Sequence, residues 1–490
     1  MRPINLADCQ ETKEFVIIGN GPSAITLSYL LAGNWPYYKP SEPHPNIELN
    51  ARLTSPSDSE TFSDQLDLST IPLVKRDLQY LSNGLPGRSR NPVSILFDAL
   101  QHPDADIGSD IPTALSWSFH PEKSVSHLVL GSGPPGGSWQ KMKDCNNTLT
   151  ISLGTWMQLP NLNIRQWSCD TKRESRVPLG RVAKYYRDYV KCQDLEKYFL
   201  NNSQVTRLEY NEDDALWKVS VMEEKVGHFT ISTPRVVLAT GVNEKPNKLG
   251  IKGESFPFVI KSLTEFEKVL SNLDRTVCND PVLIVGAGLS AADAVITARF
   301  EGIPVYHAFR RHPDDPTLIF NQLPGNMYPE YHKVHQKMKG KSLSTDYKAF
   351  PMHCISEIRA NRTVVLTNLI GAEYNGLGDS TRTTLQVSYI LALIGRRANL
   401  DFIYPKRLRS QLLQHPTQPF HSRNNPIAIN PFTHECLNVE KLYAMGPLVG
   451  DNFVRFVQGG ALAIANHFWS SSPAPISPSS SSSEDSPDDP

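Results

Sequence analysis

The chain has 490 residues, with 49 basic and 50 acidic side chains and a formal net charge of −1 at pH 7. This length suits two or more domains, or one large composite fold, with a sizeable core. The balanced charge excludes the basic excess of a nucleic-acid-binding protein. No apolar run reaches the roughly 18 residues of a transmembrane helix, and the polar N-terminus lacks the apolar core of a signal peptide. We expect an intracellular, soluble, cytoplasmic protein without a membrane span.

The seven cysteines are scattered along the chain, and no two of them form a C-x-x-C pair. A zinc ribbon and a thioredoxin-type dithiol are therefore not supported, and no metal site is predicted. An odd, dispersed set of cysteines fits reduced thiols in the cytosol.

A glycine-rich turn near the N-terminus is the first feature that carries chemistry. Residues 15–18 form a short apolar run typical of a buried parallel strand, and a helix pattern follows the turn. Gly19, Gly21 and Ala24 stand between them in the spacing G-x-G-x-x-A. Gly19 makes the tight turn, Gly21 lets the backbone approach a pyrophosphate, and Ala24 allows close packing of the helix on the strand. The pattern predicts a dinucleotide site, and an ordinary strand–turn–helix corner is the alternative.

The segment 32–125 is rich in Pro, Ser, Asn and Asp, and it interrupts the first domain. We interpret it as a long insertion that is partly ordered, because a structureless loop of this length is unusual. Helices are expected near 73–81 and 93–100. A second strand follows at 125–130, and Gly131 stands after it, where a dinucleotide fold usually has an acidic ribose ligand. Recognition of the ribose must therefore come from another residue.

A turn of sequence GGSW at 136–139 comes next. It is either a flexible turn or a backbone loop that lies against a flavin, with Trp139 as an aromatic anchor. The helical spacing of tyrosines in 176–190 predicts an amphipathic core helix. The strands expected after it lie at 204–210, 215–223 and 228–241, and the last ends in the small residues Ala-Thr-Gly, which would let a chain pass close to a cofactor.

The segment 281–295 repeats the opening device. Gly286, Gly288 and Ala291 again have the spacing G-x-G-x-x-A, between an apolar strand and a helix pattern. Two such units in one chain are far more specific than one. Their commonest occupants are FAD and NAD(P)H.

The strand after the second motif, within 302–311, ends in Arg310 and Arg311 instead of an acidic residue. An acid at this place would bind a ribose diol, whereas a cation accommodates a 2′-phosphate. The sequence therefore favours NADPH over NADH. The alternative is that both arginines are solvated loop residues.

The C-terminal part offers a further flavin contact. A strand at 442–451 ends in Asp451, and a helix pattern covers 454–468. The Asp451 carboxylate would accept hydrogen bonds from the ribityl hydroxyls of FAD, and the helix N-terminus would stabilise negative charge on the flavin. A capped corner is the alternative. The Ser- and Pro-rich segment 470–490 is expected to be disordered, with phosphorylation sites, or a tail without a role.

Several of these motifs together resemble a known family. GNGPSA, GGSW, LATGVNEKP, GAGLSAAD and HAFRR, in this order, resemble the flavin-dependent monooxygenase superfamily, and most of all its N-hydroxylating and flavin-containing branches. TWMQLP, RVPLGRVAKYYRDYV and LYAMGPLVGDNFVRFVQGGALA more narrowly resemble the oxidative stress-induced growth inhibitor family. The resemblance covers most of residues 14–468.

We therefore expect an α/β fold with two Rossmann-like dinucleotide-binding domains. The FAD-binding domain would comprise 14–245 and 401–468, with the NADPH-binding domain at 246–400 between them. The resemblance implies a NADPH- and FAD-dependent monooxygenase, in which a flavin C4a-(hydro)peroxide hydroxylates an unidentified substrate. It also implies a role in regulating cell growth, cell death or cell division, including a location at the midbody, and regulatory protein partners for the Ser-rich tail.

The resemblance also assigns residues. Carried onto this chain, it places Gly19, Gly21 and Ser23 at the FAD pyrophosphate, and Gly137 and Trp139 near the link between adenosine and flavin. NADPH would be bound by Gly286, Gly288, Ser290 and Arg310. Asp451 would bind the ribityl chain, and Asn147 would lie beside the flavin.

Two departures keep other functions open. The fingerprint of flavin-containing monooxygenases has a histidine after a glycine, but here Gly253 has none, and LALIGRR at 391–397 replaces a late ATG-type motif. An uncoupled NADPH oxidase that releases peroxide is one alternative. A flavin-fold regulatory protein with weak or no oxygenation is another, while the missing dithiol speaks against a flavin disulfide reductase.

Overall fold

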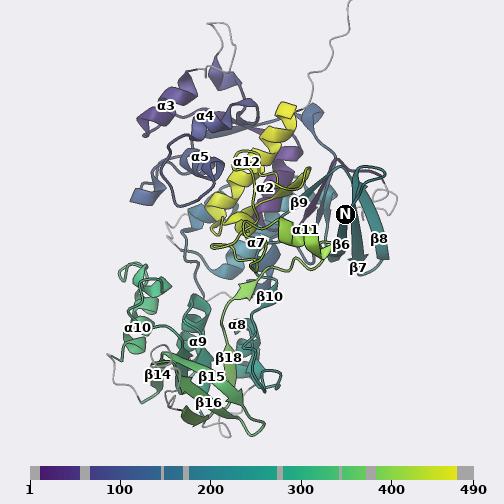
Figure 1. Cartoon of the computed structure of the whole chain (residues 1–490). Coiled ribbons are helices and arrows are strands. Elements are labelled where there is room, and N and C mark those ends of the chain that lie inside the picture. Colours follow the sequence, from purple (N-terminus) through teal and green to yellow (C-terminus); the bar gives the residue numbers. More distant parts are fainter. Residues whose placement is uncertain are drawn as a thin grey trace, which may run out of the picture.

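The computed structural model describes residues 11–55, 67–144, 148–168, 176–272, 280–340, 345–370 and 382–471. Figure 1 shows two parts, each built on its own sheet. The upper part combines the purple N-terminal and yellow C-terminal elements with teal strands and a light-green helix at its right, and the lower part contains the remaining teal and green elements from the middle of the chain. No helix within the described ranges has the length and apolar character needed to cross a membrane.

The first sheet has five parallel strands, and the strand before the first glycine motif lies at its centre. All four residues of that strand, FVII, are buried, as expected for a parallel strand covered on both faces. The sheet order is β20-β9-β1-β4-β5. The strands are β1 (Phe15–Ile18), β4 (His127–Leu130), β5 (Phe199–Leu200), β9 (Arg235–Leu238) and β20 (Leu442–Ala444).

The second sheet repeats this plan around the second glycine motif. It is parallel throughout, with the order β11-β18-β12-β13-β14. Its strands are β11 (Val259–Ile260), β12 (Val282–Val285), β13 (Val305–Phe309), β14 (Tyr347–Pro351) and β18 (Ile390–Ala392). The expected α/β fold with two Rossmann-like domains is confirmed.

An antiparallel three-stranded sheet accompanies each parallel sheet. In both halves it precedes, in chain order, the strand that returns to pair with the central strand: β9 pairs with β1, and β18 pairs with β12. The first meander comprises β6 (Ser203–Asn211), β7 (Leu216–Glu223) and β8 (Gly227–Thr233), and the second comprises β15 (His353–Ile358), β16 (Thr363–Asn368) and β17 (Arg382–Gln386). The strands expected at 204–210 and 215–223 are β6 and β7, and the single strand expected at 228–241 is divided into β8 and β9.

The helices surround the sheets in the usual layered manner. Within the described residues they are α2 (Pro22–Leu31), α3 (Ile47–Thr54), α4 (Leu78–Ser82), α5 (Pro92–Gln101), α6 (Ile164–Ser168), α7 (Leu179–Cys192), α8 (Leu263–Ser271), α9 (Leu289–Phe300), α10 (Pro329–Met338), α11 (Lys406–Gln411) and α12 (Val454–Ser471). Short 3-10 helices are η1 (Leu68–Thr70), η2 (Leu73–Lys75), η3 (Ala105–Ile107), η4 (Pro121–Lys123), η5 (Gly137–Met142), η6 (Gly154–Met157), η7 (Glu196–Tyr198), η8 (Ile319–Asn321) and η9 (Gly446–Val449).

Helix α7 is the amphipathic core helix that its tyrosines predict. Tyr185, Tyr186 and Tyr189 are fully buried, and their hydroxyls donate to the carbonyls of Leu162, Met157 and Pro160 at 2.6, 2.9 and 2.7 Å, in that order. A buried tyrosine needs such a partner for its hydroxyl. The helix thereby fixes the TWMQLP segment against the first core.

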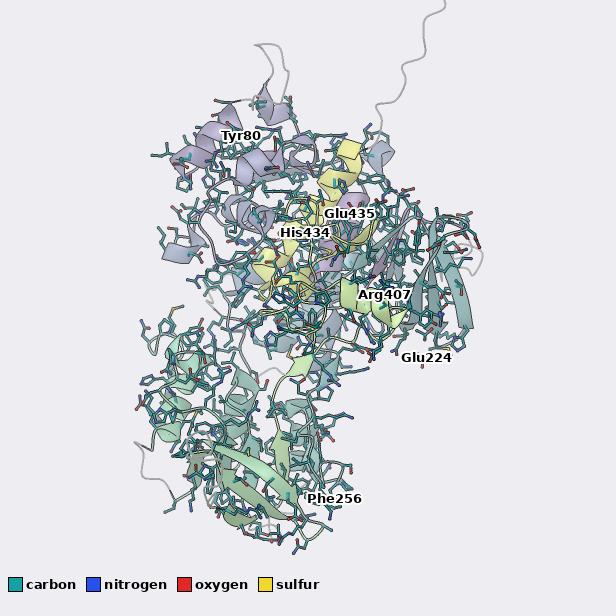
Figure 2. The ribbon with its side chains drawn as sticks, in the orientation of Figure 1. Tyr80, Glu224, Phe256, Arg407, His434 and Glu435 are labelled. Carbon is teal, nitrogen blue, oxygen red and sulfur yellow. The ribbon has the colours of Figure 1, made fainter. Side chains whose placement is uncertain are left out.

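The insertion is an ordered cap on α12, as far as the structure describes it. It contains the two expected helices as η2 with α4 and as α5, together with an antiparallel pair, β2 (Asn34–Tyr38) and β3 (Leu115–Phe119). The Lys75 ammonium donates to the Trp469 carbonyl at 3.0 Å, and the Asn466 amide donates to the Arg76 carbonyl at 2.9 Å. On another side of the same helix, His434 is buried against Gly460 (Figure 2).

The chain crosses between the two parts twice, and the crossings pair with each other. They form the antiparallel strands β10 (Lys245–Pro246) and β19 (Arg396–Arg397), at the junction in Figure 1. The Arg396 guanidinium donates to the carbonyls of Asn243 and Glu244 at 3.0 and 2.9 Å. The LALIGRR sequence thus supplies a clamp between the outgoing and returning segments.

A methyl group at Gly459 tests the contact between α5 and α12. Its Cβ would lie 2.3 Å from the Cα of Ser94, so the two helix backbones would have to separate. We expect Gly459→Ala to lower the free energy of unfolding by about 1–3 kcal/mol, although alanine is the better helix former. Gly133→Ala is the control, because its methyl meets no atom within 4 Å. Urea unfolding in which both variants match the wild type would contradict this packing.

Candidate functional site

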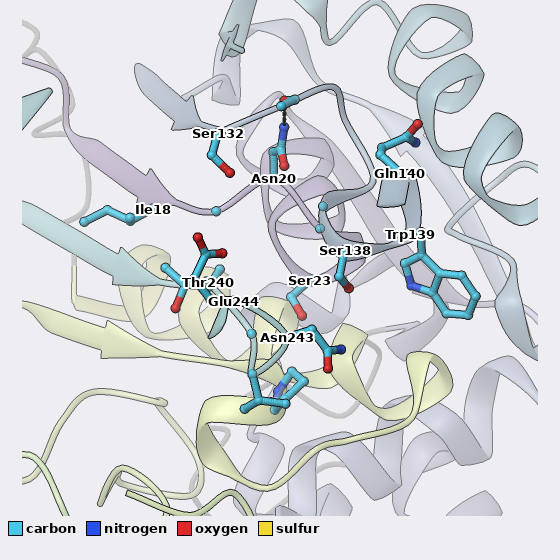
Figure 3. Close-up of a pocket in the computed structure, with 18 of the residues that line it drawn as sticks. Ile18, Asn20, Ser23, Ser132, Ser138, Trp139, Gln140, Thr240, Asn243 and Glu244 are labelled. Carbon is cyan, nitrogen blue, oxygen red and sulfur yellow. Dashed lines mark hydrogen bonds between the residues drawn. The ribbon is translucent and has the colours of Figure 1, made fainter. Parts of the chain in front are cut away.

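The first glycine motif borders a cavity of about 650 Å³ at the carboxyl ends of the first sheet. Figure 3 shows side chains from several loops converging on it. The lining comes from the segments 18–23, 130–142, 203–205, 239–244 and 447–457, together with Asn399 and Phe402. Ligands of open α/β sheets bind at this edge, and the volume lies in the range of small-molecule and cofactor sites.

The glycines of the first motif have two different environments. Gly19 has a φ of +113°, and an added Cβ would lie 2.3 Å from the carbonyl oxygen of Ala239. A side chain is therefore excluded both by conformation and by the neighbouring strand end. An added Cβ at Gly21 would meet no atom within 4 Å, so this residue opens onto the cavity.

The GGSW turn is an ordered wall of the cavity. Gly137 has a φ of +58°, and its added Cβ would lie 3.1 Å from the Cα of Gly21. The Gly136 amide also donates to the Asn20 carbonyl at 2.8 Å. Trp139 lines the cavity, and its ring meets the ring of Tyr186 edge to face, 5.9 Å between centroids. The turn therefore lies directly against the glycine loop.

The cavity wall offers donors for an anionic ligand. Helix α2 begins at Pro22, no side chain caps its N-terminus, and no acidic residue occupies its first turn. Such an N-terminus favours a phosphate group. Ser23 lines the cavity beside it, and the hydroxyl oxygen of Thr240 is buried without a partner in the described residues. Buried polar atoms normally have hydrogen-bond partners, so this hydroxyl is available to a water or a ligand in the cavity.

The missing acid at Gly131 has a steric explanation. An added Cβ there would lie 1.9 Å from the amide nitrogen of Asn20. That amide donates to the Gly133 carbonyl at 2.7 Å and to the Asn201 side-chain oxygen at 3.2 Å. The Asn20 side chain therefore occupies the space of a ribose acid and ties the ends of β1 and β4 together.

Asp451 has partners other than those expected for it. Its carboxylate accepts hydrogen bonds from the hydroxyls of Ser89 and Ser94 and from the amide of Asn91, all in the insertion. Burial raises its pKa to about 6, and these hydrogen bonds work in the opposite direction. In this turn the cavity is lined by Pro447, Asn452, Val454 and Val457. The role of Asp451 at the ribityl chain stays a prediction, and Asn147 lies outside the described residues.

The second glycine motif has the same local design as the first. Gly286 has a φ of +131°, and its added Cβ would lie 2.3 Å from the Leu393 carbonyl oxygen, whereas Gly288 opens onto free space. Helix α9 follows, without a side-chain cap at Gly288 and with Ser290 exposed in its first turn. None of these residues lines the cavity at the first motif.

The two arginines after β13 differ. Arg311 donates to the hydroxyl and the carbonyl of Thr317 at 2.9 and 3.3 Å. Arg310 is exposed and has no hydrogen bond or ion pair with the described residues. Of the two, Arg310 is therefore the cation available to a ligand.

His307 is hydrogen-bonded to the backbone of the second glycine motif. The sequence patterns did not assign it a role. Its Nε2–H donates to the Gly286 carbonyl at 2.7 Å, and its Nδ1 accepts from the Tyr347 hydroxyl at 2.8 Å. Burial lowers its pKa to about 4, so the ring stays neutral near pH 7. The sequence does show a histidine on a buried strand after the second glycine motif. Its hydrogen-bond partner, however, becomes known only from the pairing of the strands.

Comparisons with known proteins identify the family. Oxidative stress-induced growth inhibitor 1 of Mus musculus is 41% identical over 482 residues, which cover 94% of this chain and 96% of that protein. Oxidative stress-induced growth inhibitor 2 of Homo sapiens is 39% identical over 497 residues, 94% of each chain. The chain belongs to the oxidative stress-induced growth inhibitor family. A family model described as pyridine nucleotide-disulphide oxidoreductase also matches residues 118–411.

The fold of this growth inhibitor family member is similar to that of several solved structures. The bacillithiol disulfide reductase Bdr (YpdA) from Bacillus cereus has a TM-score of 0.57 at 13% identity and covers 94% of this chain and 99% of its own. The ornithine hydroxylase PvdA from Pseudomonas aeruginosa has a TM-score of 0.54 at 11% identity, with 94% and 99% covered. The fold is thus that of two-domain flavoprotein oxidoreductases.

The family model's name raises the question of a redox-active cysteine. Of the cysteines that the structure describes, Cys192 is exposed, Cys354 is partly buried and Cys436 is buried. None of these three lines the cavity. In the same described ranges, no group of three or more histidine, cysteine, aspartate or glutamate side chains is placed to hold a metal ion.

Placing an acid at position 131 tests the role of Asn20. We expect Gly131→Asp to lower the free energy of unfolding by about 1–3 kcal/mol, because the new side chain overlaps the Asn20 amide. Adding Asn20→Gly should recover much of this loss, which a double-mutant cycle by urea unfolding measures. A fully stable Gly131→Asp protein, or a pair of strictly additive effects, would show that the two side chains do not compete for this space.

Proposed function

We propose that the protein binds FAD in the cavity at the first glycine motif and NADPH at the second, and acts as an FAD- and NADPH-dependent monooxygenase. The observation that carries the proposal is the cavity wall itself. A packed glycine, an open glycine, an uncapped helix N-terminus and an unpartnered buried hydroxyl surround one space of about 650 Å³. The same packed and open pair of glycines recurs at the second motif.

The residues present fit an FAD molecule. The backbone at Gly21 and the N-terminus of α2 would hold the pyrophosphate, and the Thr240 hydroxyl would donate to the nucleotide. Trp139, Phe402, Val454 and Val457 would cover apolar parts of the ligand. When bound, FAD supplies the redox chemistry that links NADPH oxidation to oxygen. The task of the chain is to bind, orient and keep water away from the reacting groups.

Oxygen chemistry is preferred to disulfide reduction for two reasons. The sequence has no C-x-x-C pair, and none of the described cysteines lines the cavity. Solved structures of similar fold include an ornithine hydroxylase and a cadaverine monooxygenase bound to FAD, but also the bacillithiol disulfide reductase, so the shared fold does not decide between the two chemistries. The names of the curated relatives suggest that this chemistry serves a growth-inhibitory response to oxidative stress. Placement in cytokinesis or at the midbody rests on the family resemblance.

An uncoupled NADPH oxidase is the second candidate. The observation that favours it is that Gly253 has a packing role. In the monooxygenase fingerprint a histidine would follow this glycine. Gly253 has a φ of +90°, and its added Cβ would lie 2.1 Å from the Ile358 carbonyl oxygen. The next residue, Glu254, binds the backbone before Gly253, because its carboxylate accepts hydrogen bonds from the amides of Leu249 and Gly250.

Valine substitutions at the two open glycines test both cofactor sites. Gly21→Val should abolish FAD binding, because its side chain projects into the cavity. Gly288→Val should keep FAD but slow anaerobic reduction of the flavin by NADPH. Flavin absorbance measures both effects, and each variant is the other's control. A wild-type protein that takes up no FAD, or variants that behave alike, would overturn the proposal.

The oxygen reaction separates the two candidates. The NADPH-reduced protein is mixed with oxygen, and released peroxide is compared with NADPH consumed. One peroxide per NADPH, whatever substrate is offered, identifies the oxidase. A lower yield with an oxygenated product identifies the monooxygenase.

Arg310 predicts the preference for NADPH. Losing a charge-assisted contact to a 2′-phosphate should raise the KM for NADPH roughly 10-fold or more in Arg310→Ala, and leave the KM for NADH unchanged. Arg311→Ala is the matched control, since the Arg311 guanidinium is already hydrogen-bonded to Thr317. Steady-state reduction with each nucleotide measures the two constants. Equal losses with both nucleotides, or a larger effect at Arg311, would contradict the assignment.

A further inference from the structure

The cavity contains one carboxylate that the motifs do not account for. Glu244 is the single acidic residue, and Lys141 the single basic residue, among the described residues that line it. Glu244 lies after β9, at the start of the crossing to the second part. At the end of β4, where a ribose acid is usual, Asn20 fills the space beside Gly131.

The backbone around Glu244 is fixed by the clamp between the crossings. The Glu244 carbonyl accepts from Arg396 Nη2 at 2.9 Å. The preceding carbonyl, that of Asn243, accepts from Arg396 Nε at 3.0 Å and from the Lys141 ammonium at 3.3 Å. The next residue pairs with Arg397 in the β10–β19 ribbon. The carboxylate therefore extends from an anchored point of the cavity wall.

The side chain of Glu244 is directed into the cavity. In Figure 3 its carboxylate lies on the side of Ser132 and Ile18, across the cavity from Trp139. The residue is partly buried, and none of the described residues donates a hydrogen bond to its carboxylate or forms an ion pair with it. Ser132 directly follows Gly131, so this is the side on which dinucleotide folds bind ribose. The carboxylate oxygens therefore face the cavity without hydrogen-bond donors from the described residues.

We propose that Glu244 accepts hydrogen bonds from the 2′- and 3′-hydroxyls of the adenosine ribose of FAD. This inference rests on the proposed FAD site and adds the ribose ligand that the sequence leaves unassigned. A carboxylate from the crossing segment after β9 would thus replace the acid that is usual at position 131.

The test compares apo-protein variants by equilibrium binding. Quenching of flavin fluorescence gives the Kd for FAD in the wild type, Glu244→Ala and the isosteric Glu244→Gln. Hydrogen bonds to a charged group are worth about 1.5–3 kcal/mol, so we expect Glu244→Ala to weaken FAD binding about 10- to 150-fold. Glu440→Gln is the control, because Glu440 is an exposed carboxylate that does not line the cavity. Circular dichroism and thermal unfolding check that each variant is folded.

A second titration identifies the hydroxyls. ADP and 2′-deoxy-ADP compete with FAD for the wild-type protein and for Glu244→Ala. The wild type should prefer ADP, and Glu244→Ala should lose this preference. Riboflavin, which lacks the adenosine, should bind both proteins equally.

The outcomes separate this inference from the proposed function. If the wild type binds FAD and Glu244→Ala binds it equally well, the ribose assignment is overturned and the FAD site stands. An effect of Glu244→Ala on riboflavin, with the ADP preference unchanged, would move the carboxylate to the ribityl chain and overturn the adenosine assignment. Failure of the wild type to bind FAD would overturn both.

Discussion

The close contact between Gly19 and the carbonyl of Ala239 is the constraint on which the cavity depends. It joins the ends of two neighbouring parallel strands so closely that no side chain fits between them. The chain repeats this contact between Gly286 and Leu393 in the second sheet. In each case the second glycine of the motif, Gly21 or Gly288, faces open space. A closed strand junction behind an open helix N-terminus is therefore the unit from which both halves are built.

The insertion is part of this arrangement because it holds the beginning of α12. Asp451 is fixed by three donors from the insertion, and Arg455 forms ion pairs with Asp98 at 3.1 Å and with Asp106 at 2.6 Å. The same turn of helix contributes Val454 and Val457 to the cavity. A segment that interrupts the first domain in sequence thus fixes one wall of its site.

Local patterns in the sequence predicted the elements that bury a continuous or periodic set of side chains. The two central strands, the tyrosine face of α7 and the two insertion helices follow directly from apolar spacing. The pairings that complete the site could not be predicted in this way. Asn20 and Gly131, or Asp451 and Ser89, are far apart in sequence and meet only because separate strands and loops end at one edge. His307 reaches Gly286 across adjacent strands, and no local rule gives that contact.

The ribbon between the two crossings determines how the two halves can move. A single linker would allow bending and twisting in every direction. Here two linkers are joined by backbone pairing and by Arg396, and they form one short two-stranded connection. A second attachment lies elsewhere, where Arg176 before α7 pairs with Glu330 of α10 at 2.7 Å. The Tyr328 hydroxyl also donates to the Ile151 carbonyl at 2.8 Å, and the Thr264 hydroxyl donates to the Lys141 carbonyl at 3.4 Å, so the halves are joined at several places. The separation between the two glycine motifs is therefore fixed by contacts on more than one side of the junction.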